Sequence, residues 1–241
     1  MDKQKKQDKP YNLGKPGKRN GLGGPDKPEF VMNSPGKVKG KWREYLESLI
    51  IAALIAFVVR SFVVQAFKIP SSSMEPTLLI GDHLLVNRLS YAVKVPFTDI
   101  VLLRLGKPER GDVVVFRYPV DRTKDFIKRV IAKEGDVVEI KDKVVYINGN
   151  RVDYPQAVYA EPSIIPGFLN QRDNTGPVTV PRDSYFVMGD NRDRSLDSRF
   201  WGFVSYDDLV GRALILYFSW DNKAADLIHY IRWTRIGSLI R

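Results

Sequence analysis

The sequence predicts a mostly β protein: an antiparallel all-β domain with an inserted β subdomain, anchored by one N-terminal transmembrane helix. Three observations support this fold class. Short apolar runs recur at short spacing from residue 112 onward, with Gly, Pro and Asp between them. No long helical repeat follows residue 67. The only strongly hydrophobic stretch of the chain, Tyr45–Phe67, precedes this region.

The first 43 residues carry most of the net charge. They hold twelve Lys and Arg against four Asp and Glu, which accounts for +8 of the net +10. This segment is rich in Gly and Pro and poor in apolar residues, so we expect a disordered basic tail over residues 1–43. The rest of the chain is nearly neutral, which argues against nucleic acid as a partner.

The hydrophobic stretch is predicted to form a membrane-spanning helix over residues 44–66. Its strictly uncharged part, Ser48–Val59, has about a dozen residues, a length more typical of a buried core helix. Apolar residues nevertheless occupy all faces, and Arg60 can extend toward an interface while apolar residues follow it. From Tyr45 to Val64 the length approaches the roughly 20 residues that a bilayer needs. A cleaved secretory signal is disfavoured, because the preceding basic region is too long and no Ala-x-Ala-like site follows.

The Lys and Arg residues immediately before this helix set its direction. By the positive-inside rule they keep the tail in the cytoplasm and place residues 67–241 outside. The sequence therefore predicts a single-pass protein of the cell inner (plasma) membrane, in contact with lipid, with an extracytoplasmic domain.

The strands of this domain are predicted from apolar runs bounded by turn residues. Asn148-Gly149 supplies two residues that tolerate positive φ, as a two-residue hairpin turn requires. The stretch Tyr154–Arg182 is rich in Pro, Asn, Gly and Asp and marks an inserted subdomain, about residues 141–183. The basic, aromatic end of the chain, residues 227–241, is expected to pack on the domain, with contact to lipid headgroups as the alternative. The predicted strands are 112–117, 126–132, 136–140, 143–147, 150–152, 178–180, 185–188 and 212–218.

Few side chains of this sequence could supply covalent catalysis or bind a metal. There is no cysteine, which excludes a thiol nucleophile and Cys-based zinc sites, and there are only two histidines, His83 and His229. His83 directly follows Asp82, and adjacent strand residues point to opposite faces, so this pair is poorly placed for a triad. We expect both histidines to be structural or surface residues, and we expect no metal and no cofactor.

A serine between two prolines is the candidate nucleophile. The segment Pro70-Ser71-Ser72-Ser73-Met74-Glu75-Pro76 forms an exposed, stiff turn, because proline fixes φ and donates no hydrogen bond. Ser73 is then either a nucleophile or an ordinary loop serine. A serine at neutral pH needs a neighbouring base, and with the histidines set aside the candidate is a lysine. Lys128 is flanked by apolar residues, and burial there would lower its pKa; a solvent-facing lysine on an edge strand is the alternative.

A dense polar loop, Met188–Arg199, is the third candidate element. A calcium loop needs oxygen donors at alternate positions, but the alternate positions after Asp190 are Arg192 and Arg194, whose charges would repel the ion. A salt-bridged turn that ties the fold together is a second interpretation. A serine in this loop could also hydrogen-bond a neutral lysine amine and orient it.

Taken together, these segments closely resemble the type I signal peptidases, bacterial membrane-bound serine proteases that remove signal peptides from exported proteins. The resemblance implies a signal-peptidase-like fold and a Ser/Lys dyad, with Ser73 as nucleophile and Lys128 as general base. It also implies that Ser195 positions the lysine and that Ser71 joins the backbone N–H of Ser73 in an oxyanion hole. The matching segments occur in the family's order: residues 69–78, 81–82, 110–116, 127–130 and 189–199.

Further residue roles follow from the same resemblance. Asp197 and Arg199 match a structural acid–base pair, and Asp190 is expected to pair with Arg129. The shallow apolar pockets for small residues before the cut correspond to Phe67, Ile69, Leu84 and Ile127.

The resemblance also implies the partners: signal peptides of secreted preproteins, with the translocation machinery as a further candidate. A self-cleaving Ser/Lys peptidase of the repressor type is disfavoured, because no DNA-binding domain is present. A catalytically inactive, membrane-anchored β domain that acts as a binding or assembly module remains the alternative from a different class.

Overall fold

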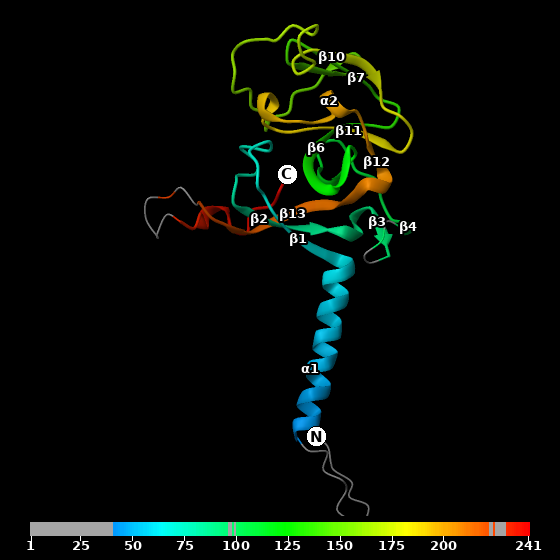
Figure 1. Cartoon of the computed structure of the whole chain (residues 1–241), viewed down its shortest axis with the longest axis vertical. Helices are drawn as coiled ribbons and strands as arrows, with labels where there is room; N and C mark the ends of the chain where they lie inside the picture. The colour runs from blue at the N-terminus through cyan, green and yellow to red at the C-terminus, as the bar shows by residue number, and fades with distance from the viewer. Residues whose placement is uncertain (1–40, 96–97, 99, 222–223, 225–229) are drawn as a thin grey trace, which may run out of the picture. The chain divides into compact units, whose positions relative to one another are not determined.

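The computed structural model describes residues 41–95, 98, 100–221, 224 and 230–241 (Figure 1). Most of the predicted basic tail, residues 1–40, and His229 lie outside the described residues. Residues Tyr45–Arg241 form one compact unit, and this unit holds all of the described strands.

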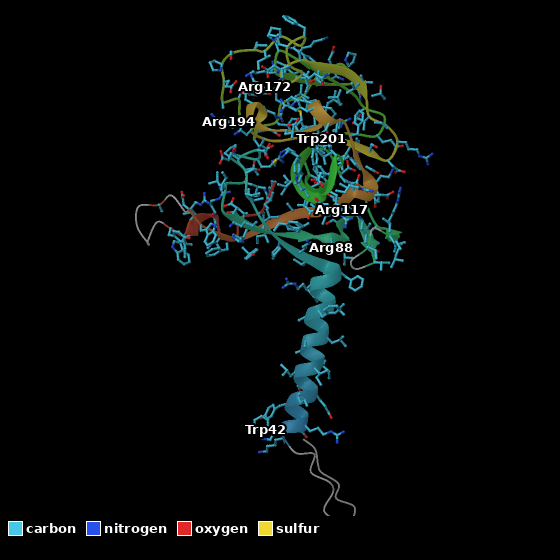
Figure 2. The ribbon with its side chains drawn as sticks, viewed as in Figure 1. Trp42, Arg88, Arg117, Arg172, Arg194 and Trp201 are labelled. Carbon is cyan, nitrogen blue, oxygen red and sulfur yellow. The ribbon has the colours of Figure 1, made fainter. Side chains whose placement is uncertain are left out.

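A helix with exposed apolar side chains begins the described chain. Helix α1 (Lys41–Val58) continues into a π-helical turn, Val59–Val63, and strand β1 begins at Val64. The helical segment thus ends three residues before the predicted boundary at 66, because Val64 and the residues after it pair with a neighbouring strand. Trp42 projects from the first turn of α1 (Figure 2) and is 88% exposed. Among the described residues, no helix has both the length and the hydropathy needed to cross a membrane.

The main body is a seven-stranded sheet in which every neighbouring pair is antiparallel, as the sequence predicts. Its strand order is β1-β2-β13-β5-β6-β11-β12, so strands distant in the sequence lie side by side. The strands are β1 (Val64–Lys68), β2 (Asp82–Asn87), β5 (Val113–Tyr118), β6 (Asp121–Lys133), β11 (Ser184–Met188), β12 (Val204–Ser205) and β13 (Leu209–Ser219).

Strand β5 separates two apolar clusters, one on each face of the sheet. Val113 and Val115 belong to a cluster with Leu84 from β2, whereas Val114 and Phe116 belong to a cluster that includes residues of β6 and β11. Because successive side chains of a strand point to opposite faces, a continuous apolar run such as 113–116 is suited to a strand buried on both sides.

A four-stranded sheet forms the inserted subdomain. Its order is β10-β7-β8-β9, and the predicted hairpin turn is present, with φ of 53° at Asn148 and 80° at Gly149. The sheet begins at Val137, earlier than the predicted boundary near 141, because β7 pairs with β8 and β10. A third apolar cluster joins this sheet to β6 and β11. The strands are β7 (Val137–Lys141), β8 (Val144–Ile147), β9 (Asn150–Arg151) and β10 (Thr175–Thr179).

The remaining elements are short. Strands β3 (Ala92–Lys94) and β4 (Val101–Arg104) form a separate hairpin, and α2 (Ser198–Trp201) is a single helical turn. Four 3₁₀ turns are described: Arg88–Ser90, Arg192–Arg194, Tyr206–Asp208 and Trp233–Arg235.

The described part of the C-terminal segment packs on the domain, as predicted. Ile240 is 9% exposed and donates its N–H to the carbonyl of Leu214 at 2.9 Å. Arg235 forms an ion pair with the buried carboxylate of Asp82 at 2.5 Å. Residues 227–229 of the predicted segment lie outside the described residues.

Candidate active site

Ser73 lies in a turn between β1 and β2 that buried neighbours hold in place. The next residue, Met74, is 1% exposed, and Leu78 is fully buried. The N–H of Leu78 donates to the carbonyl of Met74 at 2.9 Å, which closes one turn of the backbone. Ser73 itself is 9% exposed, so its hydroxyl is held at the edge of the core rather than in open solvent.

Lys128 reaches this serine from the middle of the sheet. It lies on β6 opposite Val114 of β5, is 4% exposed, and places its Nζ 2.7 Å from the Oγ of Ser73. The second hydrogen bond of Nζ goes to the backbone carbonyl of Ile127 at 3.0 Å. The fold therefore brings together two residues 55 positions apart in the sequence.

The surroundings of Lys128 favour its neutral form. Burial lowers the pKa of this amine from 10.5 to about 8, although the carboxylates of Asp197 and Asp190 oppose the change. With a pKa of about 8, roughly a tenth of the molecules carry a neutral amine at pH 7. An unperturbed lysine would be neutral in fewer than about one molecule in a thousand at this pH.

The two nearby carboxylates already have arginine partners. Arg129 binds Asp190 with both Nε and Nη2 at 2.7 Å, and these side chains are 1% and 0% exposed. Arg199 binds Asp197 in the same two-point manner, with both distances 2.8 Å. Both arrangements match the pairs expected from the sequence. Because each carboxylate is held by a guanidinium, neither is a dedicated counter-ion for the Lys128 ammonium.

Asp197 also organises the loop after β11. It accepts a hydrogen bond from the N–H of Gly189 at 3.1 Å and caps the short helix α2. Burial by itself would raise the pKa of Asp197, but attraction and hydrogen bonds from Arg199 outweigh it and hold the pKa below its usual value. Asp197 is therefore a charged anchor at neutral pH.

Ser195 lies in this loop but does not make the hydrogen bond expected of it. Its Oγ is buried and faces the carboxylate of Asp197, whose pKa this hydroxyl helps to lower.

Three residues that the sequence analysis did not single out connect the loop to the serine turn. Asn191 donates its backbone N–H to the carbonyl of Ser73 at 3.2 Å and its side-chain amide to the carbonyl of Ser72 at 3.3 Å. Thr77 donates its hydroxyl to Asp190 at 2.5 Å. Gly189 approaches so closely that a Cβ there would overlap the Ser73 carbonyl and the Ser195 hydroxyl. Of these three residues, only Gly189 had a recognisable signal in the sequence: a glycine between a buried strand and a polar loop.

The four predicted pocket residues lie in or against one apolar cluster, which also includes Met74 next to Ser73. Phe67 and Leu84 are register partners across β1 and β2. Ile69 is 3% exposed and Leu84 is fully buried, whereas Phe67 and Ile127 are half-buried and line the accessible side. The predicted oxyanion-hole residue Ser71 is exposed on the same turn. Phe67 and Ile127 make this surface apolar.

The other predicted groups do not join this site. His83 contacts the rings of Tyr217, Phe218 and Trp220 and belongs to an aromatic cluster. Asp82 binds Arg235 and the hydroxyl of Ser219, so it does not orient the imidazole. Across the described residues, no group of three or more His, Cys, Asp or Glu side chains is placed to hold a metal.

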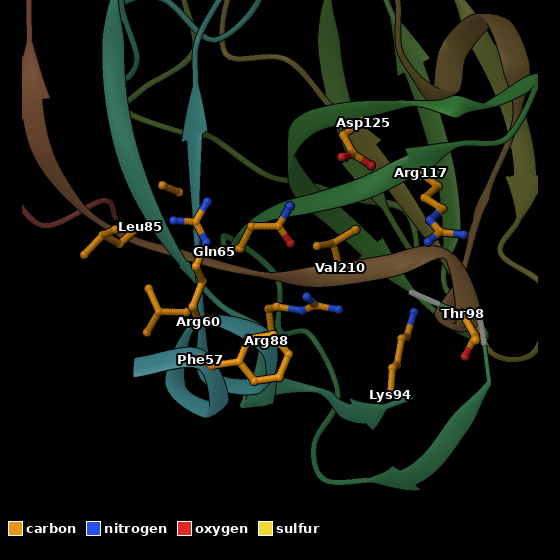
Figure 3. Close-up of a pocket in the computed structure, with 12 residues that line it drawn as sticks. Phe57, Arg60, Gln65, Leu85, Arg88, Lys94, Thr98, Arg117, Asp125 and Val210 are labelled. Atoms are coloured by element: carbon orange, nitrogen blue, oxygen red, sulfur yellow. The ribbon is translucent and has the colours of Figure 1, made fainter. Parts of the chain in front are cut away.

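A separate cavity of 590 Å³ lies near the end of the N-terminal helix (Figure 3). Phe57 and Arg60 contribute to its wall, and the side chains of Arg88, Lys94 and Arg117 come from other elements. None of its lining residues belongs to the Ser73–Lys128 site.

Comparison with known proteins gives a consistent result. Residues 42–220 match a protein family described as signal peptidase, peptidase S26. A signal peptidase I of Pseudomonas fluorescens is 38% identical, over 80% of this chain and 78% of its own. A signal peptidase I of Pseudomonas aeruginosa is 36% identical, over 78% and 77% respectively. A probable signal peptidase I-2 of Synechocystis is 40% identical, over 73% of each chain.

Proposed function

The chain belongs to the signal peptidase I family, peptidase S26, and from this membership we propose that it cleaves the signal peptides of exported preproteins. As a member of this family it is a serine peptidase and therefore a hydrolase. The observation that carries the proposed mechanism is the 2.7 Å separation between Ser73 Oγ and Lys128 Nζ, with both side chains buried.

In the proposed reaction, Ser73 Oγ attacks the carbonyl carbon of the scissile amide and Lys128 accepts the hydroxyl proton. The resulting ammonium gives that proton to the leaving amine as the C–N bond breaks, which leaves an acyl-enzyme on Ser73. A water molecule then attacks the ester, with Lys128 again as base, and releases the signal peptide. Only a neutral amine can start this sequence, which is why the burial of Lys128 matters.

We assign oxyanion stabilisation to the backbone N–H of Ser73 and the hydroxyl of Ser71. Preorganised donors aimed at the developing charge are often the largest contribution to such catalysis. The rigid turn supports this assignment, because two residues in one stiff segment keep a constant separation. Ser195 is assigned to lysine positioning, for which its hydroxyl would turn toward Nζ when substrate fills the site.

The substrate preference we propose is for small residues before the cut. Phe67 and Ile127 line the accessible side of the apolar cluster, and the buried Ile69 and Leu84 close it from behind. A shallow apolar wall leaves little room for a long side chain and offers no partner to a charged one.

We further propose that the helical segment that ends at Val63 anchors the enzyme in the plasma membrane as a single span. The basic tail would lie in the cytoplasm and residues 67–241 outside, near the lipid surface and the translocation machinery. The apolar side chains exposed along α1, from Leu46 to Val58, support a lipid environment for this helix.

The test is cleavage of a purified preprotein by the full-length enzyme in detergent. Ser73→Ala and Lys128→Ala should each abolish cleavage, whereas Ser72→Ala, a matched change on the same turn, should retain it. If Ser73→Ala still cleaves the preprotein, the dyad is wrong. If the unsubstituted chain binds the preprotein without cutting it, the inactive binding module is the better description.

A further inference from the structure

Arg192 is a buried cation that forms no ion pair with any described residue. Its side chain is 2% exposed, and within the described residues its Nε and Nη2 have no hydrogen-bond partner. Burial lowers the pKa of this guanidinium, but an arginine remains protonated in proteins, so the positive charge persists. An unpaired buried charge is costly, and proteins usually pair such groups or bind a ligand with them.

The other cations around it are already paired. Lys143 contacts Asp193 at 2.9 Å and donates to the carbonyl of Glu161 at 2.7 Å. Arg151 contacts Asp153 at 3.1 Å. Arg199 and Arg129 hold the two buried carboxylates of the dyad site, as described above. Arg192 is therefore the cation left over in a region where charges are otherwise matched.

Arg192 lines a cavity of 170 Å³ that also has Lys143 and Arg151 in its wall. Asp153 is the one carboxylate among the lining residues, and it is engaged by Arg151. Tyr154 forms an aromatic side of the cavity, with its ring centroid 5.5 Å from the Arg192 Cζ. The cavity is large enough for a phosphate or carboxylate group and carries an excess of positive charge.

We propose that this cavity is a binding site for a small oxyanion, a phosphate or a carboxylate, with Arg192 as its principal ligand. A guanidinium in the cavity wall that has no ion pair can take an oxyanion as its counter-ion, which adds to the contact with the Tyr154 ring.

The site is connected through the backbone to the loop that holds the nucleophile. The N–H of Arg192 donates to the carbonyl of Val158 at 2.9 Å, and the N–H of Val158 donates to the carbonyl of Asp190 at 2.8 Å. The intervening residue, Asn191, binds the carbonyl of Ser73. An anion bound to Arg192 therefore stabilises the segment around Val158 and the 190–192 loop together. This inference does not depend on the proposed peptidase mechanism.

Thermal unfolding of the full-length protein, titrated with sodium phosphate at constant ionic strength, tests the proposal. We expect a saturating rise in Tm, about 5 °C or more when phosphate exceeds its Kd a hundredfold. Arg192→Gln should abolish this rise. Arg151→Gln, a change at a paired and exposed cation in the same wall, should retain most of it.

Parallel titrations with acetate and with N-acetyl-glutamate amide distinguish the source of the anion. Saturation by phosphate alone identifies a free inorganic ion, and saturation by the glutamate derivative identifies an acidic side chain; either result supports the site. Broadening of the phosphate ³¹P signal by the unsubstituted protein gives a readout independent of any variant's folding. The proposal is overturned if no anion gives saturable stabilisation, or if Arg192→Gln responds as the unsubstituted chain does.

Discussion

The carbonyl oxygen of Ser73 accepts a hydrogen bond from the backbone N–H of Asn191 at 3.2 Å. This bond joins the serine turn to the polar loop after β11, two segments that lie on opposite sides of the β6 lysine in the sequence. The backbone of Ser73 is therefore positioned by the same loop that carries the buried ion pairs. The position of Ser73 therefore depends on how closely the loop after β11 approaches the serine turn.

Gly189→Ala is expected to reduce kcat/KM about 100-fold while leaving the fold intact. The added Cβ would overlap the Ser73 carbonyl and the Ser195 hydroxyl, so the loop must shift away from Ser73. Preprotein cleavage and circular dichroism measure the two effects. Gly167→Ala, whose Cβ would meet a side-chain atom at 3.2 Å in a different loop, is the matched control. Unchanged cleavage by Gly189→Ala would show that the close approach has no catalytic role.

The pH dependence of cleavage should follow the titration of Lys128. Because the base acts in its neutral form and its pKa is lowered to about 8, kcat/KM should rise roughly tenfold per pH unit below 8 and level off above it. A pH–rate profile from pH 6 to 10 measures this. An ascending limb centred near 10 would mean that the amine is hydrated in the working enzyme.

Lys128→Met should make the inactive protein more stable at pH 7. In the unsubstituted chain the folded-state pKa, about 8, lies below the unfolded value, so the folded form carries a penalty below pH 8 that is relieved as pH rises toward 10.5. Over this window the penalty amounts to about 3 kcal/mol. Urea unfolding should show a higher free energy of unfolding for the variant than for the unsubstituted chain at pH 7. This difference should be smaller at pH 10. Parallel pH profiles for both proteins would contradict the assignment.

Breaking a buried ion pair should cost far more than breaking an exposed one. Asp190→Asn leaves Arg129 buried without a charged partner, and we expect a loss of about 3–5 kcal/mol in the free energy of unfolding. Asp153→Asn, at an exposed pair with Arg151, should cost less than about 1 kcal/mol. Urea melts of both variants make the comparison. Equal losses would mean that burial does not determine the strength of these pairs.

Much of the fold is visible in local pattern. The apolar run at 113–116, buried on both faces, and the Asn148-Gly149 turn are consequences of side-chain alternation and of residues that tolerate positive φ. The boundary at Val137 was harder to place, because whether β7 joins the main sheet or pairs with β10 depends on a partner about forty residues away. The N-terminal helical segment ends at Val63 rather than at the predicted residue 66 for the same reason, because the residues after Val63 pair with β2 as a strand.

The sequence by itself determined the chemical groups available: a serine on a stiff turn, a lysine among apolar neighbours, and carboxylates spaced to meet arginines. The tertiary structure decided how far each of these groups is buried, and with it the pKa and the contacts of the group. The low pKa of Lys128, the buried Ser195 hydroxyl and the buried charge of Arg192 all depend on which distant atoms exclude water from each group. Desolvation is a property of the whole surroundings, supplied by strands far apart in the chain, so no local window of residues contains it.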